Sequence, residues 1–350
     1  MERPPLLEDP VFQLNLLLWM AKEQPHAGYR VRPLFYEQGF RIVYIEQPFR
    51  FPEETARAIE ASGLEITSSP EPEVILGRDS DKKALYFEAK ANSFGTESSK
   101  NAKQARAHLL AIGPAFKEVL SPLGECLLCY LVPADGCTPM SYCLKALCRE
   151  LNRKHLHTGP FSVHGLALRG PQVIYSWDAA FKKHVGLQDD EVAVLDNVTE
   201  ETDPTPLILV FCDDDCSNNP VRDLYRQAVI DQALACLLCD LHSHAVGKEF
   251  ETTSDELLMK ISDGVFQYLG RDRQKALRQL IRERIFKRIH EYWAEKNTVI
   301  SLTGNTFAIR WRVIGEKEEF LDWLEDRRTK FDPTKPQEHG PTLFDDQIEP

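Results

Sequence analysis

The chain has 350 residues, 43% of them hydrophobic, and this length is sufficient for two domains. No stretch reaches the ~18 apolar residues that span a bilayer, and the apolar segment 11–21 lacks the basic region and cleavage site of a secretory signal. These features exclude a membrane protein and a secreted protein from our expectations. We therefore expect a cytoplasmic protein, in which the nine cysteines are reduced thiols and not a disulfide framework.

The formal net charge of −12 disfavours a polyanionic partner for the chain as a whole. The charge is unevenly distributed, however. Segment 187–215 contains ten acidic residues and no Lys or Arg, whereas segment 271–290 contains eight Lys or Arg and two acidic residues. Electrostatic arguments therefore have to be made for each region separately.

Helices and strands are expected to alternate over the first 132 residues. Apolar periodicity, Gly and Pro positions and turn-forming residues predict the following elements. They are a helix over 10–22, a strand over 40–49, a short helix over 52–62, strands over 73–76 and 84–90, a helix over 98–120 with a break near Gly113, and a strand over 125–132. This order predicts an α/β fold with a mixed sheet at its centre.

The same criteria extend the α/β part to about residue 216 and predict a mainly helical part after it. The further elements of the α/β part are a helix over 141–155 and strands over 161–168, 173–177 and 206–212. The later part is expected to hold helices over 221–242, 254–296 and 316–330, with a hairpin over 298–314. We thus predict domains over 1–216 and 217–330, followed by a disordered acidic tail over 331–350.

Three charged residues stand out on the two strands that are predicted over 73–76 and 84–90. Side chains alternate along a strand, so Glu88 and Lys90 share one face. Hairpin pairing can bring Glu73 beside Glu88, which would place two carboxylates and one ammonium at one end of a sheet. Burial of a charge is unfavourable unless it is paired or bound to metal, and charges on an apolar strand are therefore often functional. Alternatively, the three residues face solvent on a half-exposed sheet.

Carboxylates in such a position suit a phosphodiesterase. Hard oxygen ligands hold Mg²⁺, which polarises a phosphate and lowers the pKa of a bound water. A lysine beside the metal can orient that water or stabilise the developing negative charge.

These residues resemble the motif of the PD-(D/E)xK nuclease superfamily, which includes restriction endonucleases and repair nucleases. Pro72-Glu73 stands where the family has Pro-Asp, and Glu88-Ala89-Lys90 stands where it has (D/E)-x-K. Glu73 in place of the commoner Asp is a departure that lengthens the ligand by one methylene. The resemblance covers residues 10–132 and implies a restriction-endonuclease-like core within 1–216.

The resemblance implies a Mg²⁺-dependent DNA endonuclease, with Mn²⁺ as an alternative metal. Glu73, Glu88 and the carbonyl of Ala89 would bind the metal, Lys90 would position the attacking water, and Gln104 on the following helix would support the site. Alanine at Glu88 or Lys90 is expected to abolish cleavage and to leave folding nearly intact.

Family members often use one more acid from the first helix, and the sequence does not choose among three candidates, which are Glu8, Glu23 and Glu37. The acidic charge balance indicates that the chain alone does not hold DNA strongly, so we expect it to act in a larger defence (for example antiviral), restriction or repair assembly. No ATP-binding GxxxxGK[ST] loop is present, so any helicase or ATPase in it would be a separate chain.

The basic segment 271–290 is the second candidate for contact with nucleic acid. Apolar residues recur there at helical spacing, so one stripe can pack while the rest attracts a phosphate backbone. With the hairpin around Gly304 it could form a winged-helix-like unit. The alternative is a solvated helix that forms ion pairs within the protein. The predicted nucleic-acid contacts are Arg271, Arg273, Lys275, Arg278, Arg282 and Lys287.

Two further alternatives stay open at this point. The chain could be a non-catalytic scaffold or binding subunit with a nuclease-like fold, or its substrate could be RNA. The pattern Cys236-x2-Cys239-x2-His242-x-His244 has ligand-like spacing, but it lies in an apolar helix without a Gly-containing turn. We interpret these cysteines, like Cys126 and Cys129, as core residues.

Overall fold

The computed structural model describes residues 6–23, 31–94, 99–113, 124–198, 207–209, 220–293 and 299–329. The chain divides into two units, Pro4–Leu207 and Ile208–Pro350. The boundary that the sequence predicts, at residue 216, and the predicted tail over 331–350 lie outside the described residues.

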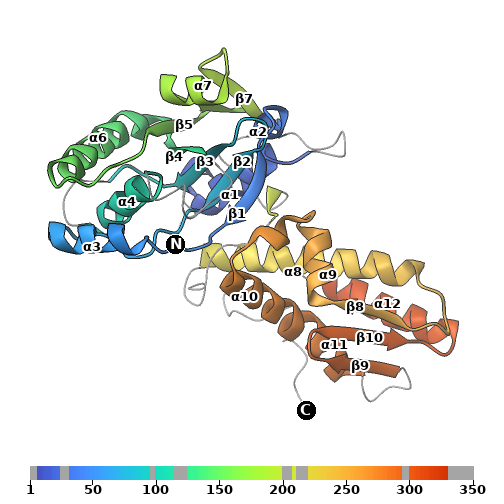
Figure 1. Ribbon diagram of the computed structural model, residues 1–350. Helices are drawn as coiled ribbons and strands as arrows, with labels where there is room; N and C mark the ends of the chain where they lie inside the picture. The colour runs from blue at the N-terminus through green and yellow to red at the C-terminus, as the bar shows by residue number, and fades with distance from the viewer. Residues whose placement is uncertain are drawn as a thin grey trace. The chain divides into compact units, whose positions relative to one another are not determined.

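The N-terminal unit is an α/β structure built on a seven-stranded mixed sheet whose strands follow the chain order from β1 to β7 (Figure 1). β3, β4 and β5 run parallel, and the other neighbours run antiparallel. The strands are β1 (Arg41–Ile45), β2 (Val74–Arg78), β3 (Lys83–Ala89), β4 (Glu125–Pro133), β5 (Phe161–Arg169), β6 (Gln172–Ser176) and β7 (Glu191–Asp196).

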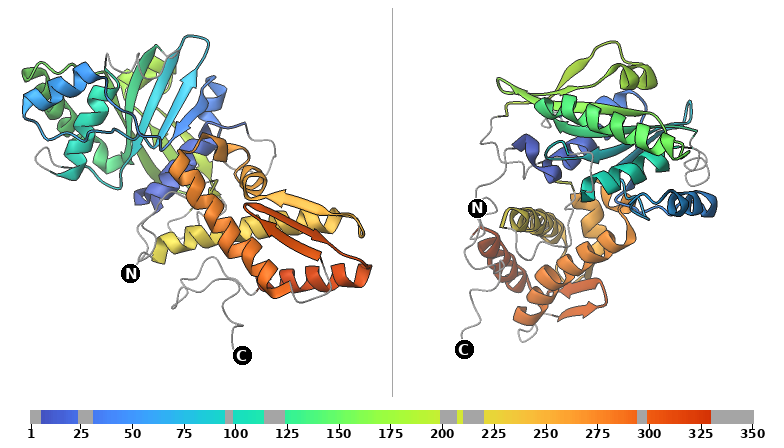
Figure 2. Two further views of the ribbon diagram at one scale, coloured as in Figure 1. Left: turned by 60° about the horizontal axis from the view of Figure 1, so that its bottom comes forward. Right: turned by 90° about the vertical axis from the view of Figure 1, so that its left-hand side faces the viewer.

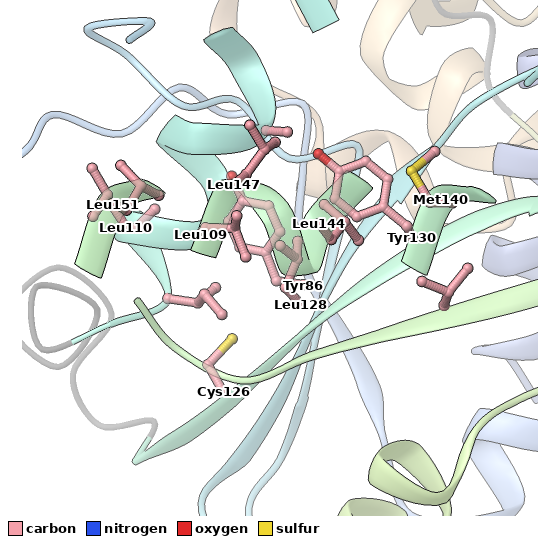
Figure 3. Packing of buried hydrophobic residues seen from close by; sticks show 14 of the residues in the cluster. Tyr86, Leu109, Leu110, Cys126, Leu128, Tyr130, Met140, Leu144, Leu147 and Leu151 are labelled. Atoms are coloured by element: carbon pink, nitrogen blue, oxygen red, sulfur yellow. The ribbon is translucent and has the colours of Figure 1, made fainter. Parts of the chain in front are cut away.

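Two helices connect the parallel strands and cover one face of the sheet. α4 (Lys100–Ala111) follows β3 and α6 (Cys137–Arg153) follows β4, and the two lie side by side (Figure 2). Between them and the sheet lies a buried cluster that includes Tyr86, Leu128, Tyr130 and Leu144 (Figure 3). Burial of this apolar surface holds α4 against β3, which fixes the position of the side chains that α4 presents to the strand.

The remaining helices of this unit lie before β1, between strands or on the other face. α1 (Pro10–Met20) contacts β2 and β3, and Phe35 of α2 (Leu34–Glu37) packs on Phe87 with ring centroids 5.3 Å apart. The others are η1 (Leu6–Glu8), α3 (Glu53–Ser62), η2 (Ala134–Gly136) and α7 (Ala179–Val185).

Local signals in the sequence explain where several of these helices begin and end. Ser99 caps α4 by accepting a hydrogen bond from the N–H of Ala102, and Asp178 caps α7 in the same way with Ala180 and Phe181. α3 ends at Gly63, whose φ of +69° is left-handed and favours glycine.

The C-terminal unit is mainly helical and contains a three-stranded antiparallel sheet in the order β8-β10-β9 (Figure 1). α9 begins with a capping box formed by Thr253 and Glu256. The described elements in chain order are α8 (Pro220–Ser243), β8 (Phe250–Thr253), α9 (Ser254–Ile261), η5 (Val265–Tyr268), α10 (Arg271–Ile281), the π-helical turn η6 (Arg282–Phe286), α11 (Lys287–Trp293), β9 (Val299–Thr303), β10 (Thr306–Arg310) and α12 (Ile314–Thr329). Within the described ranges, no helix is both long enough and apolar enough to cross a membrane.

The structure corrects the sequence prediction at several elements. The predicted strand over 206–212 is not a strand in its described part, 207–209, and the seventh strand is instead β7. β7 is a run of four apolar residues between Glu191 and Asp196 inside the acidic segment 187–215, and the acidic composition around it concealed that run. α7 and β8 were also not predicted, because each is short. α6 begins earlier than residue 141.

Candidate active site

The β2–β3 hairpin brings Glu73 to the same end of the sheet as Glu88 and Lys90. Ile75 pairs with Tyr86, and both belong to the cluster under α4. Alternation along the strands therefore puts Glu73, Glu88 and Lys90 on the face that α4 covers. A carboxylate oxygen of Glu73 accepts a hydrogen bond of 2.9 Å from the backbone N–H of Ala89, the residue between the other two.

Glu88 lies at the centre of this group and is only 1% exposed. Its Oε1 accepts hydrogen bonds from Lys90 Nζ at 2.5 Å and from Gln104 Nε2 at 2.9 Å. Lys90 Nζ also donates to Gln104 Oε1 at 3.1 Å. The three side chains thus bond to one another in a closed ring, which fixes the orientation of the Glu88 carboxylate.

His108 lies one turn after Gln104 on α4 and faces the same carboxylate. Its Nδ1 is 3.6 Å from Glu88 Oε2, and its ring lies 5.2 Å from the ring of Tyr86 between centroids. Burial lowers the pKa of His108 to about 4, so the ring is neutral at neutral pH. Glu88 Oε2 and both His108 ring nitrogens are buried without a hydrogen-bond partner among the described residues.

His108 was not predicted from the sequence. A signal for it was present, however, because His108 lies four residues after the predicted site residue Gln104, and residues four apart on a helix share a face.

Two more residues outside the motif border the site. The backbone N–H of Glu46, directly after β1, donates to the carbonyl of Glu73 at 3.1 Å, and the φ of Glu46 is +48°. Gln13 of α1 donates through Nε2 to the carbonyl of Lys90 at 3.3 Å and to that of Leu7 at 2.6 Å. The sequence gives no local signal for either residue, since both reach the site from elements distant in the chain.

The pKa shifts of the charged residues reflect crowding of negative charge. Burial raises the pKa of Glu73 well above its usual value, and the nearby charges of Glu88 and Glu46 raise it further, although Lys90 and the N–H of Ala89 oppose the shift. Burial alone would lower the pKa of Lys90, but Glu88 and Glu73 outweigh it and raise the pKa. Lys90 is therefore positively charged at neutral pH.

The three candidates for an additional acid differ in their surroundings. Glu23 accepts a hydrogen bond of 2.9 Å from the hydroxyl of Tyr36, and Glu37 forms an ion pair of 3.2 Å with Arg32. Glu8 lies in η1, which contacts β4. Glu46 was not among the candidates, yet its charge acts on Glu73.

The six basic residues that the sequence suggested for nucleic-acid binding lie in the C-terminal unit, on α10, η6 and α11. Three of them form ion pairs: Arg278 with Asp255 at 2.5 Å, Lys287 with Glu283 at 3.1 Å, and Arg282 also with Glu283. Of the other three, Arg271 and Lys275 are exposed and Arg273 is half-buried.

The cysteine and histidine pattern gives a mixed result. Cys126 and Cys129 are buried, as expected, but Cys239 is exposed, so its assignment to the core was wrong. A helix that packs on one side leaves its other side in solvent, whatever the mean hydropathy of the segment. His242 pairs with Glu325 at 2.8 Å. Within the part of the chain that the structure describes, no group of three or more His, Cys, Asp or Glu side chains is arranged to hold a metal ion.

Comparisons of the chain with protein-family models, with curated proteins and with solved structures find no match.

Proposed function

We propose that the N-terminal unit is a metal-dependent nuclease of the PD-(D/E)xK type that hydrolyses phosphodiester bonds in DNA. The observation that carries the proposal is the convergence of Glu73, Glu88 and Lys90 on one face at one end of the sheet, with Gln104 bonded to two of them. A chance match to so short a motif would not be expected to bring these side chains together.

The order and direction of the first strands support the proposal. α1, β1, β2, β3, α4 and β4 occur in the order helix, strand, strand, strand, helix and strand, which is the order of the restriction-endonuclease-like core. Two helices are inserted in it, α2 between α1 and β1 and α3 between β1 and β2. β2 is antiparallel to β3, and β3 is parallel to β4. The proposed site lies where β3 ends, which is where parallel strands commonly present functional groups.

The donor atoms are compatible with Mg²⁺, with Mn²⁺ as an alternative. Glu46, Glu73 and Glu88 bring three carboxyl groups near the ammonium of Lys90, and the charges of Glu88 and Glu46 add to burial in raising the pKa of Glu73. Glu88 Oε2 is buried without a hydrogen-bond partner among the described residues. A site with fewer than three protein side chains suits Mg²⁺, which keeps several waters and is bound through one or two carboxylates.

In this proposal Glu73, Glu88 and the carbonyl of Ala89 hold the metal. The N–H and C=O of one strand residue point to the same neighbouring strand, so the carbonyl of Ala89 is expected on the Glu73 side, to which its N–H points. The bound ion would polarise the phosphate and lower the pKa of a coordinated water.

Lys90 acts in this proposal as a donor. Its raised pKa keeps the ammonium charged, so it can orient a water or stabilise negative charge on the phosphate, but it does not accept a proton. Gln104 keeps both Lys90 and Glu88 in place through its amide. Neutral His108 adds no charge beside Glu88 Oε2.

A non-catalytic scaffold with a nuclease-like fold is the second candidate. The net charge of −12 favours it. The two candidates differ in a simple assay, because a scaffold would bind nucleic acid in a salt-sensitive way without cutting it.

Cleavage by the purified full-length chain tests the proposal. Supercoiled plasmid, single-stranded DNA and RNA would each be incubated with Mg²⁺, with Mn²⁺ or with EDTA. We expect metal-dependent cleavage of DNA, and its loss in Lys90→Ala and Glu88→Gln. Lys100→Ala is the matched control, because Lys100 is an exposed cation of α4. Cleavage at the wild-type rate by Lys90→Ala would refute the mechanism, and cleavage of RNA alone would refute the substrate.

A further inference from the structure

The C-terminal unit has an element order that matches a family of nucleic-acid-binding folds. The order is helix α8, strand β8, helices α9 and α10, and strands β9 and β10, with η5 between α9 and α10 and with η6 and α11 following α10 before β9. The sheet order is β8-β10-β9. This is the order of a winged helix, in which the second and third helices form a helix-turn-helix and the hairpin forms the wing. α9 and α10 contact each other, as that motif requires.

Side-chain contacts hold α10 firmly between α9 and the hairpin. Arg278 of α10 pairs with Asp255 of α9 at 2.5 Å. Gln274 donates to the carbonyl of Leu269, in the connection between the two helices, at 3.1 Å. Arg282, directly after α10, donates to the carbonyl of Gly304 in the β9–β10 turn at 2.9 Å. Three of the polar residues in this region thus have structural partners and are not required for a ligand.

The exposed side of α10 carries a different set of residues. Arg271, Lys275 and Gln279 are exposed and lie at intervals of four residues, so they form one stripe along the helix. α10 as a whole has three arginines and one lysine against a single acid, Asp272. Arg and Lys suit both phosphates and guanine edges, and Gln suits adenine edges.

We infer that the C-terminal unit binds double-helical DNA through this stripe of Arg271, Lys275 and Gln279, with α10 as the helix that enters the major groove. A helix-turn-helix presents its second helix to the groove in this way. The charge of α10 complements the DNA backbone although the chain as a whole is acidic. The inference deepens the proposed function, on which its relevance to cleavage rests, by naming duplex DNA as the substrate form.

Binding can be measured separately from cleavage. The full-length chain would be titrated against a fluorescently labelled duplex of about 20 base pairs in EDTA, with a single strand of the same length as competitor. The test variant is Arg271→Ala/Lys275→Ala, with Gln279→Ala as a further single variant. The control is Lys248→Ala/Arg310→Ala, which removes the same charge from exposed residues of the same unit. Arg310 ends β10, at the opposite end from the β9–β10 turn.

We expect the test double variant to bind the duplex at least ten-fold more weakly than wild type, with the control within about two-fold. The slope of log K against log salt should fall by about two in the test variant, since each phosphate contact contributes about 0.9. Unchanged circular dichroism in both variants would show that the unit is folded.

Equal losses of duplex affinity in the two double variants would overturn the inference, because binding would then depend on net charge and not on the exposed stripe of α10. Failure of wild type to bind duplex, or equal affinity for single strands, would overturn it as well. The assay distinguishes this result from the proposed function, since it is carried out in EDTA and measures duplex binding whether or not the chain cleaves.

Discussion

The ion pair of Glu88 and Lys90 makes a quantitative prediction for the stability of the N-terminal unit. Lys90→Met removes the ammonium that lies 2.5 Å from Glu88 Oε1, where the side chains of Glu88 and Lys90 are 1% and 18% exposed. Loss of one partner of a buried pair typically costs about 3–5 kcal/mol, because the other charge is left buried. Gln104 still donates to Glu88 in the variant, and the ammonium is partly solvated in wild type, so we expect about 2–3 kcal/mol.

The double variant Glu88→Gln/Lys90→Met removes both charges and should therefore be more stable than Lys90→Met alone. Its loss relative to wild type should be about 1 kcal/mol or less, since a neutral pair leaves no buried charge. The sequence-based expectation was that alanine at Lys90 leaves folding nearly intact. The burial of Glu88, which that expectation did not include, predicts a loss of stability instead.

Native-state hydrogen exchange of peptides from β3 and β4 measures this effect, because buried core strands exchange through unfolding of their own unit. A loss of 2–3 kcal/mol raises the open fraction about 30- to 150-fold. Lys100→Ala should leave exchange unchanged. Exchange at the wild-type rate in Lys90→Met would contradict this account of the ion pair. So would a double variant whose loss of unfolding free energy equals the sum of the losses in Glu88→Gln and Lys90→Met.

Three other variants test other parts of the account. Burial and the charge of Glu88 raise the pKa of Glu73, so ionised Glu73 opposes folding above the unfolded pKa. Glu73→Gln should therefore abolish cleavage but raise the free energy of unfolding by about 1 kcal/mol at pH 8 and not at pH 4. Urea titrations that show no difference between the two pH values would contradict this. Gln104→Leu, which removes the amide between Lys90 and Glu88, should reduce cleavage about 10- to 100-fold, and an unchanged rate would remove Gln104 from the site. His164 is a buried residue of β5, and burial lowers its pKa to about 3. Its contribution to stability is therefore complete above the unfolded pKa of about 6.5 and is lost as the pH falls towards 3. His164→Gln should show a shallower acid-unfolding curve than wild type, and a curve of the same slope would contradict this.

Local sequence patterns were sufficient to predict the hairpin and the residues on it. The two strands are apolar, and their alternation places Glu88 and Lys90 on one face. The helix predicted over 98–120 could be recognised as well, which gave Gln104 its position on the helix that follows β3. These features depend on periods of two and of 3.6 residues, which can be counted along a single sequence.

Contacts between distant parts of the chain could not be predicted in this way. Glu46 reaches the site because β1 pairs with β2 and the chain then turns with a positive φ. Gln13 reaches it because α1 packs on β2 and β3. Each depends on the tertiary arrangement of elements, whereas the sequence displays only neighbours along one element.

The burial of a side chain could also not be decided from the sequence where its surroundings come from other elements. Glu88 is almost completely buried because α4 covers the end of β3, and the sequence left open whether it faces solvent. Cys239 is exposed although its helix is rich in apolar residues. In both cases the packing partner decides the environment, and it is not encoded in the local composition.

Anomalous scattering from crystals soaked in Mn²⁺ tests the central claim most directly, because it locates a metal without depending on activity. We predict one strong peak within coordination distance of the carboxylates of both Glu73 and Glu88, and its loss in Glu73→Gln/Glu88→Gln. Saturating Mn²⁺ with no peak between these two residues would contradict the account, even if the metal bound elsewhere on the chain.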